Sequence, residues 1–357
     1  MPAPFGTVST LDSMRNALPN MTAMQFGEDR IWEAIQVELA VQNRLTTEFL
    51  RLFCEFTNDN MRRYGSSSRM QMQRVDQRGS VMPQKPILPG QNIGIPLALY
   101  DLATQWTTKA LERLPAQQMA RNIDAATLGD RVNVMSAVRT ALFNPTNHVE
   151  YENDLTGNPI ELPVKVLLNA DGQTIPLGPQ GESFNGGSHT HYMFAAAPSA
   201  ADGAALLENV VEHFASGDMR LYINRQEEPT VEAWTGFKAY DDPRLREGAQ
   251  AANAGALGGV QFFDLNNRRI GVFRSAQVEV KAWVPPGYLM AVNLAGPKVL
   301  AYRTYDAESG QFRLVFRDRS KPLEYSVWER EFGVAVVQRE VAAIMRVGGS
   351  YTAPANL

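Results

Sequence analysis

The chain has 357 residues, of which 44% are hydrophobic and 20% are charged, and its formal net charge is −4. This composition is typical of a folded globular protein with one large domain or two ordinary ones. The weak negative charge argues against a strongly basic, nucleic-acid-binding protein. The only cysteine, Cys54, excludes an internal disulfide framework and a cysteine-based zinc site, and it favours an intracellular, reducing origin.

The N-terminal segment has neither the basic region nor the apolar region of a signal peptide. No apolar run approaches the roughly 18 residues that a membrane span needs. We therefore expect a soluble, non-secreted chain. Residues 1–27 contain several prolines and glycines and show no hydrophobic period, which predicts an extended arm. Apolar residues such as Leu11 and Leu18 indicate that this arm lies on an apolar surface.

Residues 28–57 show helical spacing of apolar side chains, beginning with Ile31, Ile35 and Leu39. Glu28 and Asp29 precede this pattern, where acidic side chains complement the helix dipole. The pattern predicts a long amphipathic helix. Cys54 lies on its apolar face, which favours a buried structural thiol over a nucleophile.

Residues 64–114 predict a long two-stranded excursion. The sequence RMQMQRV alternates strictly between apolar and polar residues, which is typical of a strand, and a tip rich in proline and glycine follows it. A lone hairpin of this length does not bury a core by itself, so we expect it to lie on the body of this protein or on a neighbour. A solvated loop is the alternative. Its basic residues include Arg69, Arg74, Arg78 and Lys85.

Residues 115–145 predict a helix of roughly 29 residues and over 40 Å, because Pro115 suits its start and Asn144-Pro145 ends it. A shorter helix is expected at 201–216 with Asp202 as N-cap. From residue 258 the chain is mostly strands, including one at 269–284, and turns separate them. Helices and strands form separate blocks, so the predicted fold class is α+β.

No phosphate-binding loop, dinucleotide fingerprint, nucleophile elbow or zinc-protease motif occurs in the chain. The one pattern that suggests chemistry is His189-Thr190-His191, because residues i and i+2 of a strand point to the same side and two imidazoles there can share a metal. His148 and His213 are distant in sequence and give no evident third ligand. A packing or subunit contact is therefore favoured for the two histidines over a metal site.

The order of these parts resembles that of tailed-bacteriophage major capsid proteins of the Hong Kong 97 type. Residues 160–192, IELPVKVLLNADGQTIPLGPQGESFNGGSHTHY, are similar to a segment of capsid proteins from phages that infect actinobacteria. The resemblance implies an arm with a helix (1–65), an extended E-loop (66–112), a P-domain with a spine helix (113–218), an A-domain (219–325) and a return to the P-domain (326–357).

The resemblance implies a structural protein, not an enzyme, without cofactor or metal. It implies hexamers and pentamers that form an icosahedral virion shell around double-stranded DNA, assembled in the host bacterial cytoplasm. The chain starts about 27 residues before its first predicted helix, which within the resemblance implies either a mature chain or one served by a separate scaffold protein. Further partners would be a portal and, in some members, a decoration protein. Contact with DNA would be weak and independent of its sequence.

Within that resemblance the E-loop residues Arg69, Arg74, Arg78 and Lys85 are candidates for pairing with acidic surface on a neighbouring subunit. Two other functions remain open. One is an encapsulin-like nanocompartment shell with the same fold and an enzyme as cargo. The other is a metal-dependent enzyme that uses His189 and His191.

Overall fold

The computed structural model describes residues 10–64, 90–153, 156–173, 175, 189–214, 217–240, 266–318, 323–355 and 357. The predicted strand at 69–75 and the four basic loop residues Arg69, Arg74, Arg78 and Lys85 lie outside this range. The chain divides into two compact units. The first unit comprises Met1–Asn60, Ile95–Val138 and Ala301–Val334, and the second comprises Met61–Gly94, Arg139–Leu300 and Ala335–Leu357.

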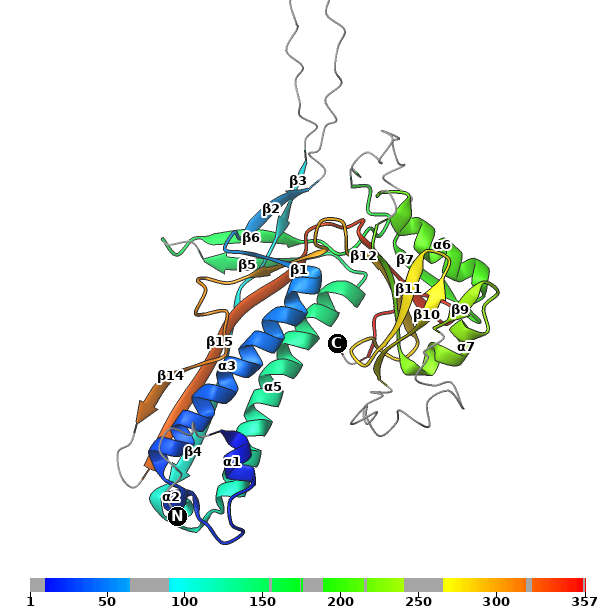
Figure 1. The fold of residues 1–357 in the computed structure, drawn as a ribbon. Helices are drawn as coiled ribbons and strands as arrows, with labels where there is room; N and C mark the ends of the chain where they lie inside the picture. The colour runs from blue at the N-terminus through cyan, green and yellow to red at the C-terminus, as the bar shows by residue number, and fades with distance from the viewer. Residues whose placement is uncertain are drawn as a thin grey trace, which may run out of the picture. The chain divides into compact units, whose positions relative to one another are not determined.

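Two long helices lie side by side in the first unit (Figure 1). The helices of this part of the chain are α1 (Leu11–Arg15), α2 (Ala23–Phe26), α3 (Glu28–Phe53), α4 (Thr108–Arg113) and α5 (Ala116–Phe143). The prediction of α5 is confirmed, because it follows Pro115 and ends before Asn144-Pro145. The helix predicted at 28–57 begins at the acidic pair as expected but ends at Phe53, because Cys54–Thr57 is an extended strand. Buried side chains of both helices belong to one hydrophobic cluster.

The prediction of an extended arm is wrong for residues 10–27. Thr10 and Thr22 each accept a backbone N–H three residues ahead, and the residue there reaches back, so both short helices begin with a capping box. Leu11 is buried in the cluster shared with α3, as expected of a residue on an apolar surface, whereas Leu18 is 69% exposed. Capping and burial, not periodicity, make this segment helical.

A five-stranded sheet packs with these helices. Its strands are β1 (Cys54–Thr57), β4 (Ala98–Thr107), β13 (Leu300–Arg303), β14 (Arg313–Asp318) and β15 (Leu323–Val336). The strand order is β1-β13-β15-β14, and β4 also pairs with β15. That pairing is antiparallel over all of β4, from Thr107 opposite Leu323 to Ala98 opposite Phe332.

Arg330 connects the layers of the first unit. Its guanidinium makes two hydrogen bonds to Asp130 of α5, at 2.7 and 2.8 Å, and one to Asn43 of α3 at 2.9 Å. It also donates to the Gly310 carbonyl at 2.9 Å. Arg330 and Asp130 are both almost fully buried, so their charges are compensated by each other and not by solvent.

A seven-stranded mixed sheet forms the core of the second unit. Its strands are β7 (Tyr192–Ala195), β8 (Met219–Ile223), β9 (Phe237–Ala239), β10 (Asn267–Phe273), β11 (Ala276–Lys281), β12 (Tyr288–Asn293) and β16 (Ala342–Val347). The order is β7-β16-β12-β8-β11-β10-β9. The helices α6 (Ala200–Val211) and α7 (Glu228–Glu232) flank this sheet and share its hydrophobic cluster, and the 3₁₀ turn η1 (Arg225–Glu227) leads into α7 (Figure 1).

Two further antiparallel pairs belong to the second unit. β2 (Met61–Tyr64) pairs with β3 (Gln91–Gly94), and β5 (His148–Asn153) pairs with β6 (Pro159–Val164). Gly94 is required where β3 meets β6, because an added Cβ would approach Leu162 to 2.6 Å. Tyr64, the last residue of β2, is paired with Gln91, the first residue of β3.

Two sequence expectations in the second unit are corrected. The helix predicted at 201–216 is α6, which ends at Val211; its N-cap is Ser199, and Asp202 is the third helical residue of the capping box. The single strand predicted at 269–284 is a hairpin of β10 and β11, whose turn includes Arg274 with a φ of 52°. A positive φ at a non-glycine residue gives no signal in hydrophobic periodicity.

The predicted α+β class is confirmed, since helices and mixed sheets occupy separate blocks of the chain. Among the described residues, no helix combines the length and the apolar character that crossing a bilayer requires. Cys54 is buried, as expected, but it is the C-cap of α3 and the first residue of β1, so the prediction that it lies on the helix face is wrong.

Candidate functional site

Three histidines and one glutamate of the second unit meet at the C-terminal end of α6. His189 and His191 come directly before β7, where Thr190 forms an isolated bridge with Asn169. Glu212 is the C-cap of α6, and His213 follows it. The ligand atoms of His189, His191, Glu212 and His213 all lie within 4.8 Å of one another.

The three Nε2 atoms form a small triangle. His191 Nε2 lies 2.9 Å from that of His189 and 3.3 Å from that of His213, and the remaining side is 3.2 Å. Glu212 Oε1 lies 2.8 Å from His189 Nε2 and 3.4 Å from His213 Nε2. Four potential ligand atoms therefore surround one point, all from neighbouring segments of one unit.

A hydrogen bond to the backbone fixes the orientation of the His191 ring. Its Nδ1 lies 2.7 Å from the carbonyl oxygen of Ala342 on β16, and a carbonyl only accepts, so Nδ1 carries the proton. The Nε2 atom then presents its lone pair to the cluster. A backbone carbonyl that fixes the tautomer in this way is typical of metal-ligating histidines.

Burial shapes the electrostatics of the cluster. It lowers the pKa of His213 to about 3, holds the pKa of His191 well below its ordinary value and also lowers the pKa of His189. Burial likewise raises the pKa of Glu212. The three imidazoles are therefore neutral at pH 7, which is the protonation state that binds metals.

The sequence reasoning identified His189 and His191 but missed His213 and Glu212. The pair does point to one side, as expected, although it precedes the regular strand β7 instead of lying in it. His213 was set aside because it is 24 residues from His189. The available signal was the restriction of three of the chain's four histidines to residues 189–213, with Glu212 beside one of them.

A second buried polar group holds residues 166–171, whose backbone is hydrogen-bonded to His189 and His191. Arg339 is fully buried and pairs with Asp171 at 3.0 Å. It also donates to the carbonyl oxygens of Val166 and Leu167, at 2.6 and 3.3 Å. Burial opposes ionisation of Asp171, but the hydrogen bond and charge of Arg339 outweigh it and keep the pKa of this carboxyl low.

The first unit has apolar surface that the described residues of the chain leave uncovered. Leu99 on β4 is 61% exposed, and Tyr100 and Leu102 are each 39% exposed. A broad groove of about 630 Å³ runs between this strand and α5. The exposed apolar residues of the two long helices are Val41, Leu45 and Leu52 on α3, and Leu128 and Val132 on α5.

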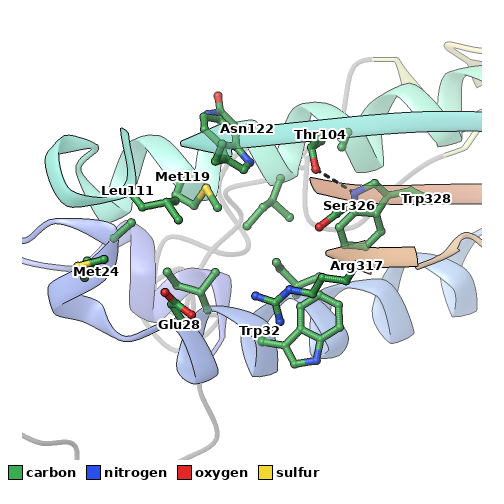
Figure 2. Close-up of a pocket in the computed structure, with 16 residues that line it drawn as sticks. Met24, Glu28, Trp32, Thr104, Leu111, Met119, Asn122, Arg317, Ser326 and Trp328 are labelled. Atoms are coloured by element: carbon green, nitrogen blue, oxygen red, sulfur yellow. Dashed lines mark hydrogen bonds between the residues drawn. The ribbon is translucent and has the colours of Figure 1, made fainter. Parts of the chain in front are cut away.

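A narrower apolar pocket lies between α2, α3, α4, α5 and the sheet of the first unit (Figure 2). Trp32 and Trp328 line it, and the Trp328 indole donates to Thr104 Oγ1 at 3.2 Å. The Arg317 guanidinium lies over the Trp32 ring at 4.7 Å. The pocket has room for only about 60 Å³ of solvent. That is far below the roughly 300 Å³ of ordinary small-molecule sites, so it indicates imperfect packing and not substrate binding.

No protein-family profile and no curated protein matches this sequence. Among solved structures, the chain is similar to a protein of Mycobacterium phage Patience, with a TM-score of 0.65 and 19% identity over 99% of this chain and 97% of the other. This likeness shows that the two proteins share a fold along their whole length. It confirms the expectation that the chain has the fold of a phage protein.

Weaker likenesses exist to the capsid of a native GTA particle and to the holo-SrpI encapsulin complex of Synechococcus elongatus. The TM-score to the GTA capsid is 0.44, with 13% identity over 84% of this chain and 90% of the other. The TM-score to the encapsulin is 0.41, with 12% identity over 86% of this chain and 90% of the other.

Proposed function

We propose that the chain is the major capsid protein of a tailed bacteriophage. It assembles into hexamers and pentamers of an icosahedral shell that encloses double-stranded DNA. The observation that carries this proposal is the fold shared with a phage protein over 99% of the chain. The resemblance of the sequence to Hong Kong 97-type capsid proteins and the uncovered apolar surface of the first unit support it.

The surface of β4 favours assembly over a monomer. No residue of this ten-residue strand is buried, although it carries Leu99, Tyr100 and Leu102. Exposed apolar strand surface promotes association, and soluble monomers rarely leave large patches uncovered. Repeated contacts between different surfaces of identical chains close into rings, which fits hexamers and pentamers.

The remaining roles follow from the same proposal. With a net charge of −4, the chain contacts packaged DNA weakly and without sequence preference, because a strongly basic lining would bind phosphate. A separate scaffold protein directs assembly in the host bacterial cytoplasm, a portal occupies one vertex, and a decoration protein is an optional addition. The five-part division into arm, E-loop, P-domain, A-domain and return to the P-domain is part of this proposal.

Electron microscopy of the purified chain tests the proposal most directly. We expect icosahedral shells or rings of capsomers, and in particles from infected cells we expect nuclease-protected double-stranded DNA. Shells that contain an enzyme and no DNA would instead support the encapsulin-like alternative. A monodisperse monomer at high protein concentration would contradict both shell functions.

The basic loop allows a more specific test. We propose that Arg69, Arg74, Arg78 and Lys85 pair with acidic surface on an adjacent subunit. Changing Arg74→Glu together with Arg78→Glu then places like charges in contact and abolishes shell formation, whereas Arg74→Lys with Arg78→Lys keeps the charge and retains assembly. Sedimentation at low and high salt measures shell formation by both double variants. Normal particles from the Glu variant would contradict the proposed charge pairing.

A further inference from the structure

We propose that His189, His191, His213 and Glu212 bind one divalent transition-metal ion, with zinc as the best fit, in a closed four-ligand site. The four side chains belong to one unit and converge without any rearrangement. The proposal goes beyond shell formation and does not depend on it. Its purpose in the fold is to fasten the C-terminal end of α6 to the segment that leads into β7.

The distances match tetrahedral coordination. Zinc lies 2.0–2.1 Å from a histidine nitrogen, so two ligand atoms of a regular tetrahedron are about 3.3 Å apart. The three Nε2···Nε2 distances are 2.9, 3.2 and 3.3 Å, and Glu212 Oε1 lies 2.8 and 3.4 Å from two of these nitrogens. Five edges of the tetrahedron thus have nearly the length that one central ion would impose.

Hydrogen bonds alone do not account for these contacts. Each neutral imidazole has one N–H, and that of His191 is already directed to the Ala342 carbonyl. At most one proton each remains on Nε2 of His189 and of His213, and a protonated Glu212 would add one more. Two or three protons cannot make five hydrogen bonds, so in the remaining contacts one lone pair faces another. A central cation satisfies all of them at once.

The surroundings suit a structural ion. His213 and His191 are buried, whereas the side chains of His189 and Glu212 are 19% and 29% exposed, which leaves a route for the ion to enter. A catalytic zinc site keeps one position for water, but here Glu212 occupies the fourth position. This favours a structural site over the metal-dependent enzyme considered from the sequence.

Zinc titration of the full-length chain tests the proposal. The protein is stripped with EDTA and then titrated with zinc chloride in competition with a chromophoric chelator. We expect one equivalent per chain, and at least tenfold weaker binding for His189→Gln and for Glu212→Gln. The matched control is His148→Gln, which removes an exposed histidine on β5 and leaves zinc binding unchanged.

Cobalt(II) supplies a readout of geometry. In the stripped wild-type chain, we expect the intense visible bands of four-coordinate cobalt and a raised thermal midpoint with either metal. Both are absent in His189→Gln. If that variant fails to fold, Glu212→Gln, which changes a more exposed side chain, carries the same test. Zinc affinity equal in the wild type and in both variants, or no zinc binding by the wild type, would overturn the proposal.

Discussion

Strands β4 and β12 show how differently the two units use apolar residues. All six residues of β12 are buried in the seven-stranded sheet, whereas none of the ten residues of β4 is buried. Both strands are rich in apolar side chains, so composition alone does not separate them. In the second unit β12 is covered by neighbouring strands and helices, whereas the described residues of the chain leave β4 of the first unit uncovered.

The largest effect is expected on assembly. Changing Leu99→Glu and Leu102→Glu removes two exposed apolar side chains from β4. Burying one leucine is worth about 1.5–3 kcal/mol, so losing two such contacts weakens association by roughly a hundredfold or more. Analytical ultracentrifugation measures the loss of shells or capsomers.

The control is Ala98→Glu with Gln105→Glu, which adds the same charge to exposed positions of the same strand. Assembly of this control should be close to normal. Equal losses in both variants would mean that charge, and not the apolar surface, explains the first result.

A smaller effect concerns two buried ion pairs, Arg330–Asp130 of the first unit and Arg339–Asp171 of the second. Asp130→Ala leaves Arg330 buried without its partner, which lowers the free energy of unfolding by about 3–5 kcal/mol. Asp171→Ala should cost about half as much, because the Asp171 side chain is 17% exposed and Arg339 keeps its carbonyl partners.

Urea denaturation of the non-assembling Leu99→Glu, Leu102→Glu chain compares the two changes. Trp32 and Trp328 report on the first unit, and Trp234 and Trp283 report on the second. Each alteration should lower the transition of its own unit first. A larger loss of unfolding free energy for Asp171→Ala than for Asp130→Ala would contradict the expected order.

The smallest effect is a pH dependence confined to the second unit. Burial raises the pKa of Glu340 to about 7, despite the nearby Tyr64 hydroxyl and the charge of Arg339. In the unfolded chain this carboxyl loses its proton near its ordinary pKa of 4.5. Between these two values the folded state holds a proton that the unfolded state has lost, so stability falls as pH rises from 4.5 to 7.

Glu340→Gln removes that dependence. We expect the variant to match the wild type near pH 4.5 and to exceed it by on the order of 2 kcal/mol above pH 7. Unfolding of the non-assembling chain, followed by fluorescence across this range, measures the difference. A constant difference at every pH would show that the substitution acts through packing and not through ionisation.

The sequence predicted those parts of the fold that depend on local pattern. Periodicity and proline placed α3 and α5, whereas α1 and α2 are too short to show a period and depend on capping and tertiary burial. The hairpin of β10 and β11 was missed because its turn uses Arg274, an unusual residue at positive φ. Local pattern also cannot indicate that β4 pairs with a strand more than 200 residues later.

The same limit applies to the candidate metal site. His189 and His191 form a visible pattern, because two residues apart in sequence they point to one side. His213 and Glu212 enter only because α6 folds back on the sheet, which brings its C-terminal end to the segment before β7. Arg339 likewise meets Asp171 across 168 residues of chain. Tertiary folding, not spacing, completes both groups.

The position of Arg330 in the chain also sets the timing of folding. It joins Asp130 across 200 residues and Asn43 across 287 residues, and it lies on the strand that holds β4. A nascent chain on the ribosome therefore presents α3, α5 and β4 without their partner strand until Leu323–Val336 has been synthesised. The surface that we propose for assembly becomes ordered only after β15 has been made, so a subunit gains the ability to join its neighbours more than 200 residues after β4 itself has been synthesised.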